Sequence, residues 1–189
     1  NSEANTDPQC SFEALAARAE GLILLSGGVM DGFVGLPASD GRQALAKARL
    51  ESLHSIMQGR VYIELQRHGL GAEQVAEPIL VELADKLDLP LVATNDCRFD
   101  TPKMAGPHDA LVCVGTGRKV SEDNRLKYSP NHYFKSAKQM TDLFIDIPEA
   151  ITNSVIIAKR CSYMSPERAP ILPPFTSKTG NTEDVELAR

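Results

Sequence analysis

The fold of this 189-residue chain is decided by residues 61–94, VYIELQRHGLGAEQVAEPILVELADKLDLPLVAT. The stretch opens on one apolar run, Val61–Leu65, and closes on another, Leu89–Thr94. Runs that are apolar on both faces are typical of strands buried in a parallel sheet. Residues 73–87 between them have apolar side chains at helical spacing, and Pro78 predicts that the regular part begins near Glu77. The side chains expected to face inward are Val75, Ile79, Leu83 and Leu87.

The residues before this unit repeat the same alternation. A short helix over residues 11–20 leads into the apolar run Leu22–Leu25, which predicts another buried strand and ends in Ser26-Gly27-Gly28. Residues 31–40 are expected to be a loop because Gly and Pro interrupt them. Asp40 is then expected to cap a helix through Met57. Its predicted inward stripe is Ala46, Leu50, Leu53 and Met57. Strands that alternate with helices predict an α/β fold with a parallel sheet.

The pattern changes after residue 100, where helices are expected without further strands. Residues 109–114 predict a helix, and residues 115–130 a charged loop. Ser136 and Gln139 form a capping box that opens a helix, and Pro148 suits the first position of the next. Ile151, Val155 and Ala158 are expected on one face of that last helix. We therefore divide the chain into a polar segment 1–10, a main unit 11–165 (strands and helices to 100, helical extension 101–165) and a Pro-rich linker 166–189.

Composition excludes several classes of function. The net charge is −5 and the sequence pI is about 5.4, so a globally basic nucleic-acid binder is not expected. The sequence has neither an apolar run of membrane-spanning length nor a signal peptide at its start. Its four cysteines form no C-x-x-C pair. These features predict a cytoplasmic protein with reduced thiols.

Polar side chains that could do chemistry follow the predicted strands. Glu64 and His68 lie on and after the second strand, and Asp96 and Arg98 follow the third. Because functional groups gather at the carboxyl ends of parallel strands, we expect these four at one mouth. One interpretation is a metal site with Asp96, Glu64 and His68 as ligands, which would suit Zn, Mn or Fe. The other is that Asp96 caps a turn or pairs with Arg98 and that His68 packs in a loop.

Weaker signals lie elsewhere in the chain. Gly27-Gly28 could offer backbone amides to an anion, although a tight turn explains the pair as well. Residues 98–138 contain eight Lys or Arg against four Asp or Glu, so Arg118 and Lys119 could face phosphate or DNA, or simply solvent. The remaining candidates lack partners at catalytic or ligand spacing: Ser26, His54, Cys97, His108 and His132.

Seven motifs in fixed order resemble one family over about residues 11–175. They are EGLILLSGG (20–28), VYIELQRHG (61–69), LVATND (91–96), HDALVC (108–113), YSPNHYFKS (128–136), FIDIPEA (144–150) and IAKRC (157–161). Together they resemble the alpha subunits of bacterial DNA polymerase III, in the later part of their N-terminal polymerase-and-histidinol-phosphatase (PHP) domain. The resemblance implies part of a distorted barrel of about seven strands, (β/α)7, whose first half is absent. Three predicted strands with open edges agree with a segment of a larger protein.

The resemblance also implies where a metal would bind and why this chain departs from that pattern. Family members with an intact site have an H-x-H motif, a Cys or His where this chain has Gly28, and a late D-x-H where it has Asp96-Cys97-Arg98. Arginine supplies a permanent positive charge in place of a ligand lone pair. We therefore expect Arg98 and Gly28 to inactivate the site, leaving no catalytic residue here and at most residual Zn or Mn.

The implied role is that of a non-catalytic scaffold. The resemblance implies a parent nucleotidyltransferase that uses Mg and contacts DNA, with its polymerase carboxylates outside this chain. It also implies two partners, the rest of the alpha subunit and the proofreading exonuclease subunit. The alternatives are an active metal-dependent phosphoesterase of the PHP family and an unrelated small α/β binding module.

Overall fold

The computed structural model describes residues 10–168 and 180–188. Its sheet contains three parallel strands in the order β1 (Leu24–Leu25), β2 (Val61–Leu65) and β3 (Leu91–Ala93). Leu24 of β1 pairs with Val61, and Ile63 of β2 pairs with Leu91. The three predicted strands and their parallel arrangement are confirmed, although β1 and β3 are shorter than their apolar runs. The architecture is thus mixed α/β with a small parallel sheet.

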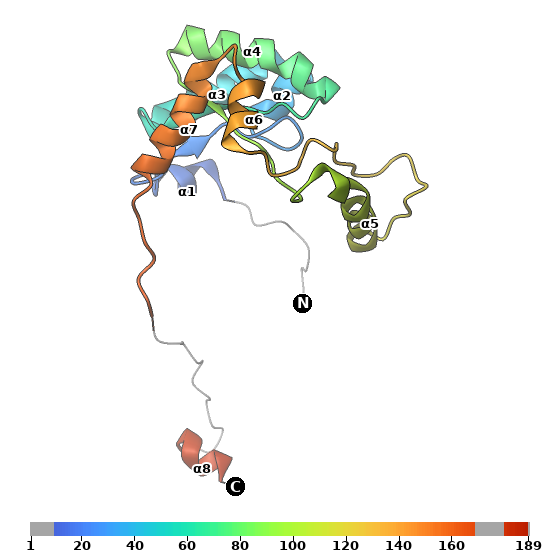
Figure 1. Ribbon diagram of the computed structural model, residues 1–189. Coiled ribbons are helices and arrows are strands. Elements are labelled where there is room, and N and C mark those ends of the chain that lie inside the picture. Colours follow the sequence, from blue (N-terminus) through green and yellow to red (C-terminus); the bar gives the residue numbers. More distant parts are fainter. Residues whose placement is uncertain (1–9, 169–179, 189) are drawn as a thin grey trace.

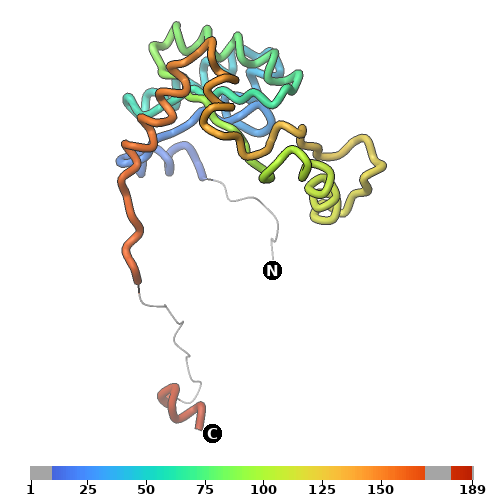
Figure 2. Tube along the Cα trace, in the orientation of Figure 1, coloured from blue at the N-terminus to red at the C-terminus, as the bar shows by residue number. Residues whose placement is uncertain are grey.

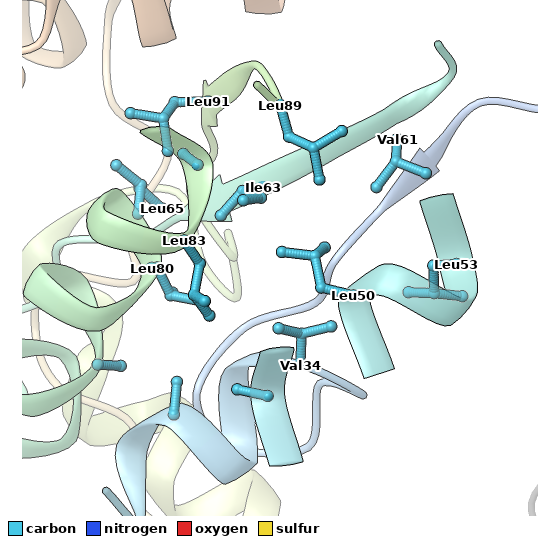
Figure 3. Packing of buried hydrophobic residues seen from close by; sticks show 14 of the residues in the cluster. Val34, Leu50, Leu53, Val61, Ile63, Leu65, Leu80, Leu83, Leu89 and Leu91 are labelled. Atoms are coloured by element: carbon cyan, nitrogen blue, oxygen red, sulfur yellow. The ribbon is translucent and has the colours of Figure 1, made fainter. Parts of the chain in front are cut away.

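Three helices pack together over the sheet, namely α2 (Gly35–Ser39), α3 (Gln43–Met57) and α4 (Gly71–Leu87). Figure 3 shows how their side chains interdigitate with those of β2: Leu50 and Leu53 come from α3, and Leu80 and Leu83 from α4. Ile63 of β2 is completely buried against this cluster. Burying an aliphatic side chain of this size stabilises a fold by roughly 1.5–3 kcal/mol. Packing in this core therefore fixes the position of β2 and of the residues that follow it.

The second half of the chain supplies helices on other sides of the sheet. The 3-10 turn η1 (Pro102–Met104) leads into α5 (Ala105–Thr116), and α6 (Ala137–Leu143) and α7 (Pro148–Arg160) follow. Helix α7 packs on β3. In the tube of Figure 2, α5 and the loop after it extend away from the sheet and return toward it near residue 130. None of the helices in the described ranges is both long and apolar enough to cross a membrane.

The two edges of the sheet differ. Asn153 Nδ2 of α7 donates to the Leu91 carbonyl at 2.8 Å, and Ser154 Oγ donates to the Ala93 carbonyl at 2.8 Å. These side chains satisfy the outer edge of β3. On the other side, β1 pairs only with β2 within the described part of the chain. An exposed strand edge is a template for pairing with another strand.

Several helix predictions are confirmed in detail. The buried stripe of α3 is the predicted one, Ala46, Leu50, Leu53 and Met57. Ser136 and Gln139 form the predicted capping box of α6, and Pro148 is the first residue of α7. The signals were local in each case, because a cap or an apolar stripe needs no information from distant residues.

Other predictions for the first half of the chain were wrong. The opening helix is only α1 (Phe12–Ala16), because the chain leaves the helix in a turn before Gly21. Residues 31–40 contain α2, which the Gly and Pro residues had concealed; Pro37 lies within it, buried. Asp40 does not cap α3: its carboxylate accepts a hydrogen bond from the Arg42 side chain instead.

Helix α4 begins earlier than predicted, and its inward face is confirmed at Leu83, with Ile79 and Leu87 partly buried against the core, but not at Val75. It begins at Gly71 and continues through Pro78, which lies inside it and is exposed. Val75 is 48% exposed, whereas the buried residues are Glu73, Ala76, Leu80, Leu83 and Ala84. The physical reason is that a buried carboxylate, Glu73, belongs to the inward face, which an apolar pattern cannot reveal.

The later helices also differ from expectation. Helix α5 is longer than residues 109–114 and includes Gly115 and Thr116. In α7 the buried residue is Ala150, and Ile151 packs partly buried against the core as predicted. Val155 is 52% exposed and Ala158 is exposed, so the prediction was wrong for these two residues. The segment 166–189 contains a short helix, α8 (Glu183–Leu187). The polar start and much of the Pro-rich linker, residues 1–9 and 169–179, lie outside the described residues.

Candidate functional site

A cavity of about 440 Å³ lies at the carboxyl ends of the strands. Its wall includes all four predicted residues, Glu64, His68, Asp96 and Arg98, together with Gly28. The expectation that they meet at one mouth is therefore confirmed. β2 and β3 position them, because parallel strands that end at similar heights deliver the next residues to one edge of the sheet.

Asp96 and Arg98 form an ion pair on the cavity wall. Arg98 donates from Nε and Nη2 to Asp96 Oδ2 at 2.9 and 2.7 Å. The guanidinium also lies over the Tyr128 ring, 4.7 Å from its centre. Burial disfavours the charge on Arg98, but the hydrogen bonds to Asp96 outweigh it and raise the pKa of Arg98. The carboxylate of Asp96 is therefore ion-paired with the permanently charged guanidinium of Arg98, two residues along the chain.

Glu64 is held by neighbouring polar groups. Its Oε1 accepts from Gln66 Nε2 at 3.0 Å and from the hydroxyl of Thr94. The backbone N–H of Glu64 donates to Ser26 Oγ at 2.9 Å, so the buried Ser26 links the end of β1 to β2. Ser26 is therefore a structural residue. Glu64 thus joins the three strand ends, to β1 through its backbone N–H and to the end of β3 through its carboxylate.

His68 is buried through a contact that the sequence patterns did not predict. Its Nδ1 lies 2.7 Å from Glu73 Oε1, and its backbone N–H donates to Glu73 Oε2 at 2.7 Å. Leu70 N donates to the same Oε2 at 3.0 Å, so Glu73 also caps the start of α4. Burial works against ionisation of Glu73, but these hydrogen bonds, that of His68 foremost, lower its pKa overall. Glu73 is a buried carboxylate held ionised by its donors.

A second histidine, His132, is buried beside His68. The rings of His68 and His132 stack with centroids 3.8 Å apart and an angle of 9° between their planes. Burial, and next the nearby His68, lower the pKa of His132. Ser129, three residues before His132, donates a hydrogen bond from Oγ to the His68 carbonyl at 2.8 Å and so links the two histidine segments. Sequence reasoning missed the pair because the two residues are 64 positions apart. The Glu73 contact could have been found by reading Glu73 as the third residue of a helix that starts at Gly71.

The side chains present do not fit a metal centre as they are arranged. Within residues 10–168 and 180–188, no three His, Cys, Asp or Glu side chains are grouped so as to hold a metal ion. Asp96 is paired with Arg98, whereas His68 gives its Nδ1 to Glu73 and keeps Nε2 without a partner among the described residues, so of these two only His68 has a free ligand atom. A metal ligand needs a free lone pair, and a neighbouring guanidinium repels the cation.

The weaker candidates lie apart or have structural contacts. Arg118 follows α5 and pairs with Glu122 at 3.2 Å, and Lys119 donates its backbone N–H to the same carboxylate. Neither is in the described wall of the cavity. His54 is exposed on α3, and His108 packs near the Phe99 and Tyr128 rings. Cys97 is exposed and accepts from Asn95 Nδ2 at 3.0 Å.

The glycines at the end of β1 form a tight turn. Gly27 has a φ of +83°, and a Cβ on Gly32 would lie 2.3 Å from the carbonyl carbon of Gly27 and from the oxygen of Gly28. These residues therefore allow two backbone segments to touch. The turn interpretation of Gly27-Gly28 accounts for their presence.

Three curated relatives of this chain are alpha subunits of DNA polymerase III. The chain is 45% identical over 181 residues to the DNA polymerase III subunit alpha of Caulobacter vibrioides, and 37% and 39% identical to those of Rickettsia bellii and Pseudomonas fluorescens. These alignments cover 96%, 93% and 91% of the chain. This chain is homologous to one segment of the DNA polymerase III alpha subunits. It spans 15–16% of the length of those relatives, and no family model matches it.

Proposed function

We propose that this chain serves in DNA replication as a non-catalytic supporting segment of a DNA polymerase III alpha subunit. The observation that carries the proposal is 45% identity to such a subunit along 96% of the chain. The whole protein is then a nucleotidyltransferase that acts in the cytoplasm, uses Mg and binds DNA. Its polymerase carboxylates lie in parts of the subunit that this segment does not include.

The geometry of the cavity supports a site that has lost its metal chemistry. Asp96 retains a ligand type, but Arg98 holds one of its oxygens with two hydrogen bonds. Glu64 is engaged by Gln66 and Thr94, and Gly28 offers no side chain to a metal. These contacts join the strand ends directly, so they can stabilise the fold where an ion would otherwise do so.

The open edge of β1 supports a larger sheet in the complete subunit. The chain aligns with 16% of the length of the Caulobacter relative, so most of that protein has no counterpart in it. We propose that strands from the rest of the alpha subunit continue the sheet at β1 into a PHP-type barrel. The second proposed partner is the proofreading exonuclease subunit, which would dock on this domain.

A metal titration of the intact protein tests the degenerate site. Calorimetry with Zn²⁺ or Mn²⁺ should detect no tight stoichiometric binding at this cavity, whereas Arg98→His should gain binding that Asp96→Asn then abolishes. Arg118→His, which places an imidazole away from the cavity, is the matched control and should gain none. Tight binding by the unaltered cavity, together with metal-dependent phosphatase turnover, would instead support the active phosphoesterase.

A further inference from the structure

One buried nitrogen beside the cavity lacks a partner. His68 is 1% exposed, and its Nε2 makes no hydrogen bond to any residue that the structure describes. Buried polar atoms are nearly always hydrogen bonded in native proteins, so an unpaired one indicates a missing ligand or water. His68 belongs to the described wall of the cavity, whereas Glu73 does not, and His132 stacks on one face of the His68 ring.

The partner on the other ring nitrogen determines what Nε2 can bind. Glu73 Oε2 already accepts from the backbone N–H groups of His68 and Leu70, and its Oε1 faces the ring, so we assign the proton between the two side chains to His68 Nδ1. In the neutral ring, Nε2 is therefore a lone-pair acceptor. A ligand that satisfies it must donate an N–H or O–H.

The charges around the cavity favour a positively charged ligand. Among the described residues of its wall are three carboxylates, those of Asp31, Glu64 and Asp96, and one guanidinium, that of Arg98. A cleft lined mainly by one sign of charge concentrates ligands of the opposite sign. Asp31 is exposed, and its carboxylate accepts no hydrogen bond within the described structure.

The size and the apolar walls of the cavity fit a small organic molecule better than a single metal ion. Its volume of about 440 Å³ is within the range of small-molecule sites. The rings of Tyr128 and His132 provide apolar wall that methylene groups can cover. We propose that the cavity binds a small aliphatic ammonium compound, which donates an N–H to His68 Nε2 while its charge faces Asp31 and Glu64.

Titration of the intact protein with putrescine (1,4-diaminobutane), followed by calorimetry at physiological salt, tests the proposal. We expect saturable binding that Asp31→Asn weakens about threefold, as loss of a partly exposed ion pair should. Asp100→Asn removes an exposed carboxylate outside the described cavity wall and should leave the affinity unchanged. No saturable binding, or equal weakening by both variants, would overturn the proposal, as would saturation of the cavity by inorganic phosphate.

His68→Asn addresses the acceptor itself. The asparagine amide can still donate toward Glu73 but has no atom at the position of Nε2. We expect binding about tenfold weaker, the scale of one hydrogen bond to a charged group. A thermal melt checks that this buried substitution leaves the protein folded, and the comparison of Asp31→Asn with Asp100→Asn decides the question if it does not. The ¹⁵N resonance of His68 Nε2 should also move on addition of putrescine, and a resonance that stays fixed would contradict the contact.

Discussion

Glu73 links three parts of the site with one side chain. It accepts from His68 through both the ring and the backbone, and from the backbone of Leu70. Replacement by Gln should lower the free energy of unfolding by about 3 kcal/mol, because it leaves buried donors without their charged acceptor. Urea denaturation measures the loss. Glu82→Gln, an exposed carboxylate on the same helix, should change stability much less, and an equal loss in both variants would contradict this role.

The same carboxylate makes stability depend on pH in a defined direction. The pKa of Glu73 is lowered in the fold, so its contribution is complete above the ordinary carboxyl pKa and is lost as pH falls through the lowered value. Urea titrations between about pH 6 and pH 3 should therefore show a decrease that is smaller in Glu73→Gln. An identical pH dependence in both proteins would show that Glu73 does not carry the effect.

Gly32 tests the tight turn at the end of β1. An added Cβ would lie 2.3 Å from backbone atoms of Gly27 and Gly28, which cannot move aside as a flexible side chain could. Gly32→Ala should cost about 1–3 kcal/mol, as overpacking does. Gly71→Ala is the matched control, since its Cβ would meet no atom within 4 Å. A Gly32→Ala protein with an unchanged melting temperature would contradict the proposed close approach.

At the scale of elements, predictability depended on how local the signals were. The strand Val61–Leu65 and the buried stripe of α3 were predictable because each depends only on the spacing of apolar residues within the element itself. Helix α4 was misjudged because Glu73, a buried charge, is on its inward face and Pro78 lies inside it. At the site, the Asp96–Arg98 pair could be anticipated from spacing of two residues. The His68–His132 stack could not, since only the fold brings those rings together.

Helix α7 provides a prediction at the same scale. Asn153 and Ser154 donate to the Leu91 and Ala93 carbonyls and so satisfy the outer edge of β3. The double substitution Asn153→Ala, Ser154→Ala should destabilise the protein by about 1–3 kcal/mol, the sum of two hydrogen bonds. Thermal unfolding measures it, with Thr152→Ala on the exposed side of α7 as control. A double variant as stable as the control would show that the edge does not need these donors.

At the scale of the whole molecule, we propose that this segment supports the alpha subunit and that catalysis takes place in other parts of it. The most direct test measures template-directed DNA extension and phosphoesterase turnover on the same preparation of the intact protein, with and without Asp96→Asn. We expect metal-dependent extension by both proteins and phosphoesterase turnover by neither. Phosphoesterase turnover that requires Zn²⁺ or Mn²⁺ and disappears in Asp96→Asn would contradict this proposal.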